Sequence, residues 1–182
     1  MLFRSQDVVR LLIDLAGLDP EFNDDGARGA WMSDPRLVPI RENIERIFSL
    51  NDWAEIIVAI NLAFEPLAGA LVKDEFLARN ASHNGDPVTP VILAAARRDT
   101  ARHLDTTAAF VRFLVTDPEF GADNRQVIGQ WAERWAAESA AAARAASGLF
   151  EVGGIVLTGD GSAALHRVTG AQSGLVRDLG ID

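Results

Sequence analysis

Two glutamates lie inside the most apolar part of the sequence. Glu55 and Glu65 both fall in NDWAEIIVAINLAFEPLAGALVKDEF, residues 51–76. A buried carboxylate has to be paired with a cation, be protonated or bind a metal ion. Di-metal sites in helical bundles take one Glu from each of two helices and a Glu-x-x-His from each of two others, because residues i and i+3 share a helix face. The positions of the histidines therefore decide whether a metal is expected.

The histidines do not have that spacing. The residues three positions before the three histidines are Asn80, Thr100 and Ala163. Asp99 and His103 stand four residues apart and could contact one metal, but an intrahelical pair is the simpler interpretation. The sequence therefore predicts no catalytic, cofactor-binding or metal-binding residue in this chain.

For the charged positions we predict a structural polar network or an interface instead. Its members are Glu65, Arg98, Asp99, Arg102 and His103. Within this set, Glu65 is expected to be a buried carboxylate paired with an arginine of ARRDTARH, residues 96–103, in the next helix.

Other candidate residues have structural explanations. Asp52 is suited to cap the helix that contains Glu55. Trp131 and Trp135 lie one helical turn apart and are expected to pack between helices rather than stack on a ligand. GDGS, residues 159–162, lacks the lysine that completes a phosphate-binding loop, so a turn is predicted there. No Gly-x-Ser-x-Gly motif supports a hydrolase.

Composition narrows the class of protein further. The 182 residues carry a net charge of −9, which disfavours nucleic acid and anionic membranes as partners. The chain has no cysteine, so disulfides, thiolate metal sites and thiol nucleophiles are excluded. Charged or amide residues interrupt every apolar run, so no transmembrane span of ~20 residues is predicted. The expected location is the cytoplasm.

The hydrophobic periodicity predicts an all-α fold, an antiparallel bundle of long helices. The expected helices are residues 5–17, 35–50, 52–82, 89–116 and 125–147. Ser5 is expected to cap the first, residues 18–35 to form a loop, and Pro66 to bend the third. The tail 148–182 holds eight of the fifteen glycines and is expected to be a weak hairpin or an arm that orders on a partner. The predicted domains are thus 1–150, helical, and 151–182, the tail.

Three blocks of sequence together resemble a known family. They are DWAEIIVAINLAFEPLAG, NGDPVTPVILAAARRDTARH and QWAERWAAESAAAA, at residues 52–69, 84–103 and 130–143. In this order they resemble the β (small hydroxylase) subunit of soluble diiron multicomponent monooxygenases, the methane, propane, phenol, toluene and alkene hydroxylases. The resemblance runs from about residue 5 to residue 150. Family β subunits are longer and begin with further helices, so the resemblance implies an N-terminally truncated subunit.

The resemblance implies a partial ferritin-like bundle that is homologous to the catalytic α subunit but lacks its iron ligands. This chain would be a non-catalytic scaffold in an α₂β₂γ₂ hydroxylase, and a coupling protein would regulate that hydroxylase. The diiron centre would lie in the α subunit and hydroxylate an alkane or aromatic hydrocarbon with O₂. FAD and a 2Fe-2S cluster would lie in a partner reductase. Propane or another alkane is the substrate that the resemblance favours.

Two alternatives remain open at this stage. One is a metal-active ferritin-like protein similar to the small subunit of ribonucleotide reductase, although the chain has no tyrosine to carry the usual radical. The other is a non-enzymatic helical module that binds a partner helix.

Overall fold

The computed structural model describes residues 9–10, 13–18 and 24–181, and within them it contains helices and connecting turns but no strand. The all-α prediction is confirmed. Residues 9–10 and 13–18 are helical, whereas the predicted cap Ser5 lies outside the described residues. The named helices are α2 (Asp24–Ser33), α3 (Val38–Phe48), α4 (Trp53–Val58), η1 (Ala59–Gly69), η2 (Leu71–Ala78), η3 (Ala81–Asn84), α5 (Thr89–Val115), α6 (Gly121–Ala146), η4 (Ser147–Glu151) and α7 (Gly161–Asp178).

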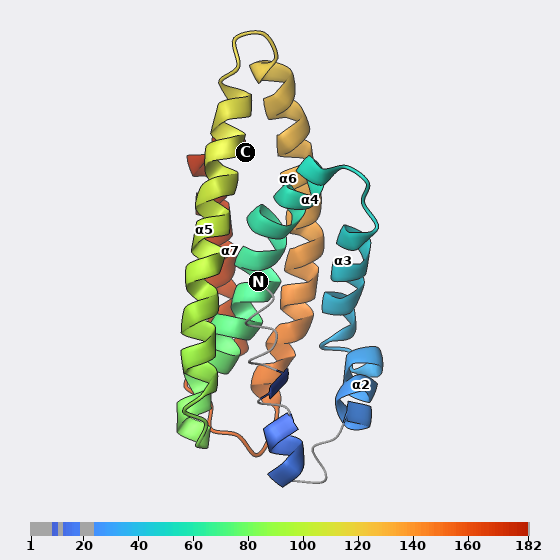
Figure 1. Ribbon diagram of the computed structural model, residues 1–182, viewed down its shortest axis with the longest axis vertical. Helices are drawn as coiled ribbons and strands as arrows, with labels where there is room; N and C mark the ends of the chain where they lie inside the picture. The colour runs from blue at the N-terminus through green and yellow to red at the C-terminus, as the bar shows by residue number, and fades with distance from the viewer. Residues whose placement is uncertain (1–8, 11–12, 19–23, 182) are drawn as a thin grey trace.

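The long helices form a bundle along one axis (Figure 1). Helices α5 and α6 run antiparallel and are joined by a tight turn at one end. The continuous rod α4–η1–η2 packs against both of them, α7 packs on the same rod, and α3 lies against α6. The rod is therefore the central element of the bundle.

Aspartate side chains accept backbone hydrogen bonds at the starts of three helices. The Asp52 carboxylate accepts hydrogen bonds from the backbone N–H of Ala54 at 2.8 Å and of Glu55 at 3.4 Å, so the predicted cap is confirmed. Just before α5, the carboxylate of Asp86 accepts from the N–H groups of residues 88 and 89. Asp160 accepts from the N–H of Ala163 at the start of α7. Each carboxylate satisfies donors that the first turn of a helix leaves unpaired.

Part of the predicted loop 18–35 is helical. Residues Asp24–Ser33 form α2, because the run GARGAWMS has no proline to stop a helix before Pro35. The chain then turns at Asp34, whose carboxylate accepts from both the backbone and the guanidinium of Arg36. These hydrogen bonds, the side-chain one above all, lower the pKa of Asp34 to about 2.

The rod is wound as a π-helix over η1 and η2, with Pro66 inside η1. In a π-helix each N–H serves the carbonyl five residues earlier, so Pro66, which has no N–H, cannot serve that of Asn61. The buried side chain of Gln172 on α7 donates to the next carbonyl, that of Leu62, at 3.2 Å. Helix α7 is thus joined to the rod by a hydrogen bond beside the carbonyl that the proline cannot serve.

Three groups of buried apolar residues line the rod. The first joins it to α3, α6 and α7: Ile40, Leu67, Ala68, Leu71, Ala142, Ala143, Ala146, Phe150, Ala164 and Val168. The second joins it to α5, α6 and the C-terminal residues: Val58, Leu62, Ala108, Val111, Val115, Ile128, Ala132, Leu179 and Ile181. The third joins it to α3 and α6: Ile47, Ala59, Ala63 and Trp135. The high apolar content of residues 51–76 is explained by this central position.

The prediction of a hairpin in the tail is wrong. Residues Gly161–Asp178 form α7, which is capped by Asp160 and packs on the rod. Gly161 is required at the close approach to η4, because a Cβ there would overlap the carbonyl oxygen of Ser147. Other glycines of the tail lie in the turn before α7, at 153, 154 and 159, or on α7 at 170 and 174, where no atom lies within 4 Å of an added Cβ.

Candidate functional site

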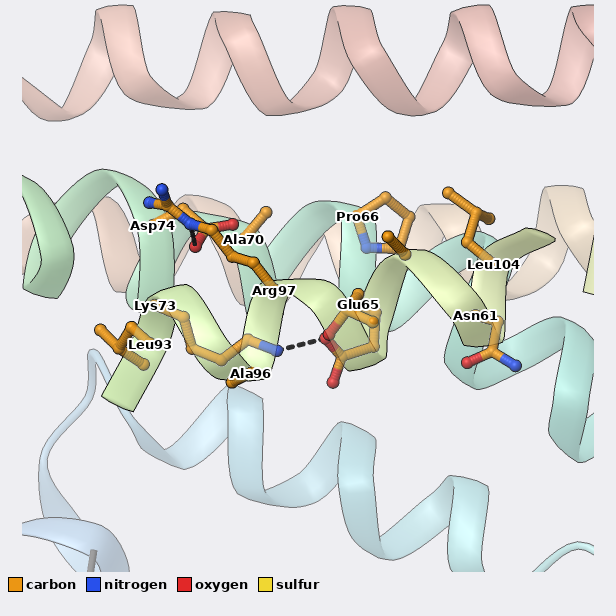
Figure 2. Close-up of a pocket in the computed structure, with 12 residues that line it drawn as sticks. Asn61, Glu65, Pro66, Ala70, Lys73, Asp74, Leu93, Ala96, Arg97 and Leu104 are labelled. Carbon is orange, nitrogen blue, oxygen red and sulfur yellow. Dashed lines mark hydrogen bonds and ion pairs between the residues drawn. The ribbon is translucent and has the colours of Figure 1, made fainter. Parts of the chain in front are cut away.

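A half-open cavity of about 230 Å³ lies between η1, η2 and α5. Figure 2 shows the side chains that line it, which come from the rod and from α5. Its walls are mainly apolar, and the lining residues are Asn61, Glu65, Pro66, Ala70, Lys73, Asp74, Leu93, Ala96, Arg97, Thr100, Ala101 and Leu104. Of the five residues of the predicted polar network, Glu65 lines this cavity, and the other four do not.

Glu65 is paired with Lys73, not with an arginine of the next helix. The ammonium of Lys73 donates to Oε2 of Glu65, and both side chains belong to the π-wound rod (Figure 2). The Glu65 side chain is 21% exposed, so its carboxylate is half-buried. Gly69 leaves room for this carboxylate, since a Cβ at residue 69 would lie 3.2 Å from Oε2. The predicted partner was wrong because the wound rod brings Lys73, eight residues on, close to Glu65.

An arginine does reach across from α5, but to a different carboxylate. Arg97 donates through Nε to Asp74 at 2.5 Å, linking α5 to η2 at the rim of the cavity. Asn61, deeper in the cavity, donates to Oγ1 of Thr107 on α5 at 2.8 Å. Two polar contacts therefore fix α5 against the rod, one at each end of the cavity.

The other four members of the predicted network lie on α5, and three of them are exposed. Arg98, Arg102 and His103 are exposed, and Asp99 is half-buried. Arg102 donates to Asp99 at 3.4 Å, an i, i+3 pair in which the arginine side chain is 76% exposed. The structure thus divides the predicted set into a pair inside the cavity, Glu65 with its lysine, and a charged outer surface on α5.

Glu55 lies in a contact that the sequence did not predict. Its Oε1 accepts a hydrogen bond from the indole N–H of Trp135 at 2.9 Å and forms an ion pair with Arg134. Trp135 is only 3% exposed, and the guanidinium of Arg134 lies 5.0 Å from the centre of its ring. The packing role predicted for Trp135 is confirmed, and Glu55 joins α4 to α6 through it.

Glu75 is the most enclosed carboxylate of the rod, and the sequence analysis missed it. Its Oε2 accepts from Nε and Nη2 of Arg167 on α7 at 3.1 and 2.6 Å, and its Oε1 accepts from Nη2 of Arg79 at 3.3 Å. Burial opposes ionisation of this carboxyl, but the two guanidinium groups outweigh burial and hold the pKa of Glu75 below its usual value. The only signal in the sequence was the i, i+4 spacing of Glu75 and Arg79.

The described residues do not fit a metal centre. Among them no group of three or more His, Asp, Glu or Cys side chains converges, and the carboxylates of the rod face cations. Lys73 and Arg167 occupy the directions from which a metal ion would bind Glu65 and Glu75, and His103 is exposed on α5. Glu65 and Lys73 pair within the rod, and Glu55 and Glu75 join the rod to α6 and α7.

Comparison with known proteins gives the family. Residues 2–118 match the model of the methane/phenol/alkene hydroxylase family. The chain belongs to this family. The matched part contains α2 to α5 with the whole rod, and hence both walls of the cavity.

Relatives within the family are subunits of hydroxylase components. The chain is 34% identical over 141 residues to the propane 2-monooxygenase hydroxylase component small subunit of Rhodococcus jostii (strain RHA1), covering 78% of this chain and 38% of that subunit. It is 32% identical over 142 residues to the methane monooxygenase component A beta chain of Methylosinus trichosporium, covering 75% and 36%. For the toluene-4-monooxygenase hydroxylase subunit beta of Ectopseudomonas mendocina the values are 30% over 110 residues, 59% and 32%. The chain thus spans between about a third and two fifths of the length of these hydroxylase relatives.

One helix of the described chain is long and apolar enough to cross a membrane by length and composition alone. It is the rod, Trp53–Ala78, with a mean hydropathy of 1.7 in its most apolar 18-residue window and 44% of that window buried. A core helix passes the same test, and Ala59, Leu62 and Ala63 are fully buried in the hydroxylase-family bundle. The rod's apolar character is accounted for by packing.

Proposed function

We propose that this chain is a non-catalytic β-type subunit of the hydroxylase component of a soluble diiron monooxygenase. The observation that carries the proposal is the family match over residues 2–118 together with relatives that are all hydroxylase small or beta subunits. In this proposal the chain is a scaffold for an α subunit that holds the diiron centre. A γ subunit, a coupling protein and a reductase with FAD and a 2Fe-2S cluster complete the system, and the complex acts in the cytoplasm.

The chemistry of the described residues supports a scaffold role. Every carboxylate that faces the inside of the bundle from the rod has a cationic partner: Lys73 for Glu65, Arg167 for Glu75 and Arg134 for Glu55. A carboxylate that is held by an ammonium or guanidinium group is neutralised and is a poor iron ligand. The substrate, an alkane or an aromatic hydrocarbon, would be bound and hydroxylated in the α subunit, where the diiron centre activates O₂.

Co-expression with the cognate α and γ subunits tests the proposal. The chain, tagged, is expected to co-purify with α and γ, and iron analysis is expected to find iron in proportion to α only. Loading the chain alone with Fe(II) under anaerobic conditions is the matched control. Two tightly held irons per chain in that control, or failure to co-purify with α, would contradict the scaffold assignment.

A further inference from the structure

The outer surface of α5 has an unusual combination of side chains for a solvent-facing helix. Val91, Arg98, Arg102, Ala109 and Phe113 are all exposed, and we call this set the α5 stripe. Their spacing of seven, four, seven and four residues places them on one face, because 3.6 residues complete a turn. Val91 is 69% exposed and Phe113 70% exposed. An exposed apolar side chain thus lies at each end of the stripe, valine at one and phenylalanine at the other, with two arginines and an alanine between them.

The charge of α5 is opposite to that of the chain. The helix carries four arginines and two aspartates, whereas the whole chain has a net charge of −9. Arg97 is used in the ion pair with Asp74, but Arg98 has no ion-pair partner among the described residues. A basic face on an acidic protein attracts an acidic surface of another protein and suppresses contacts with basic ones.

The stripe is also long enough for a helix-to-helix contact. From Val91 to Phe113 it extends about 33 Å at ~1.5 Å per residue. Helix α5 lies at one edge of the bundle, on the side opposite to α3 (Figure 1). Its opposite face, with Val111, Thr107 and Val115, is buried on the rod. The helix is therefore fixed from within and presents the stripe outward as a rigid surface.

We propose that the α5 stripe docks an acidic helical surface of the α subunit of the hydroxylase component. The arginines would pair with carboxylates of that subunit, and Val91 and Phe113 would enter apolar sites at the two ends of the contact. The inference rests on the proposed function for the existence of the partner, and it adds the surface and the chemistry by which the partner is recognised. Arginine and aromatic residues are enriched at protein–protein interfaces and among the residues that contribute most to binding free energy.

Matched pairs of variants test the stripe. Arg98→Glu reverses a charge within it, and Arg144→Glu reverses an exposed charge on α6 as the control. Phe113→Asn removes an aromatic ring within it, and Phe48→Asn removes one of similar exposure, 74%, at the end of α3. All four positions are exposed, so melting temperatures are expected to stay close to that of the parent.

The readout is the affinity of each variant for the cognate α subunit. It is measured as Kd with the α subunit immobilised on a sensor surface, at two salt concentrations. Arg98→Glu and Phe113→Asn are each expected to raise Kd at least tenfold, and the two controls less than twofold. The effect of Arg98→Glu is expected to shrink at high salt, because exposed charges are screened. Equal Kd values for stripe and control variants would overturn the stripe while leaving the proposed function standing.

Two further outcomes also decide whether the stripe docks the α subunit. If the unchanged chain does not bind α, both the stripe's partner and the proposed function are wrong. If sedimentation shows that the chain self-associates and that Arg98→Glu abolishes this without changing the affinity for α, the stripe serves a second copy of the chain and the proposal is overturned.

Discussion

Carboxylates pair with arginines both on the outer face of α5 and between the rod and its neighbours. The arginine of the α5 pair is mostly exposed, whereas the carboxylates that join the rod to α6 and α7 are largely buried. On α5, Asp99 and Arg102 pair within one helix, and the arginine is mostly in solvent. Between η2 and α7, Glu75 accepts two hydrogen bonds from Arg167 across 92 residues of sequence, and the carboxylate side chain is 11% exposed. The first pair orders one turn of a helix, while the second joins two helices.

This difference indicates how the bundle is held together. Ion pairs within an exposed helix contribute ~0.2–0.5 kcal/mol. Hydrogen bonds to charged groups contribute about 1.5–3 kcal/mol, and a buried group left without its partner costs its desolvation. The polar contacts that matter for stability are therefore expected to be those between helices, at Trp135, Glu75 and Gln172. The predictions below test that ranking.

Trp135→Ala is expected to have the largest effect. The residue is buried between α4 and α6, and its removal deletes a large apolar side chain together with the donor to Glu55. Truncation of a buried tryptophan costs about 3–5 kcal/mol. Chemical denaturation monitored by circular dichroism measures the change. Trp53→Ala, at a position that is 62% exposed, is the control and should lose much less; equal losses would show that Trp135 is not a core residue.

Glu75→Ala is expected to lower the free energy of unfolding by about 1.5–3 kcal/mol, because charge-assisted hydrogen bonds from α7 are lost. Arg167 and Arg79 are roughly half exposed and can be rehydrated, which keeps the loss below that of a fully buried pair. Hydrogen exchange should then show faster opening of α7 than of α5. Uniform exchange in all helices would contradict the role of Glu75 as the link to α7.

The same carboxylate predicts a pH dependence. Since the pKa of Glu75 is lower in the folded chain than its usual 4.5, its contribution is complete above that pH and is lost as the pH falls through the folded pKa. The difference in unfolding free energy between the parent and Glu75→Gln should be constant near neutral pH and shrink below pH ~4.5. A difference that grows on acidification would have the wrong sign and would exclude an ionised Glu75.

Gln172→Leu tests the hydrogen bond between α7 and the rod. The side chain is buried and donates to the Leu62 carbonyl, so the variant removes this hydrogen bond at a cost of about 1–3 kcal/mol. Gln126→Leu, at an exposed position of α6, is the control and should lose much less. Equal losses would show that the hydrogen bond to Leu62 does not stabilise the bundle.

Most of the long helices could be predicted from the sequence because their signals are local. The cap Asp52 and the apolar spacing of α5 and α6 depend only on neighbours within a few residues. Helix α7 was missed because its glycines suggested turns. Its stability comes from Asp160 at its start and from packing on the rod, and the latter is a tertiary effect that overrides local propensity.

The candidate site was predicted less well, for a physical reason. Sequence spacing identifies pairs at i, i+3 or i, i+4 on a regular α-helix, and it suggested Asp99 with His103. The structure pairs Asp99 with Arg102, three residues on, in the same helix. It could not find Glu65 with Lys73, because the π winding of the rod changes which residues share a face. Nor could it find Glu75 with Arg167, since no pattern in one sequence relates residues 92 positions apart.

Asp99→Ala is expected to have the smallest effect of the series. Its pair with Arg102 is within one helix, the arginine side chain is 76% exposed, and such pairs contribute ~0.2–0.5 kcal/mol in isolated helices. His103→Ala is expected to behave alike, because the imidazole is exposed on the same helix. Both variants should melt within a degree or two of the parent, and raising the salt concentration should remove most of the remaining difference for Asp99→Ala.

In a reconstituted hydroxylase, turnover per assembled complex should be unchanged by either variant, since a scaffold side chain does not touch the reacting atoms. Normal assembly with turnover lowered by orders of magnitude would instead assign Asp99 or His103 to the chemistry and would reverse the comparison between the outer face of α5 and the interior contacts.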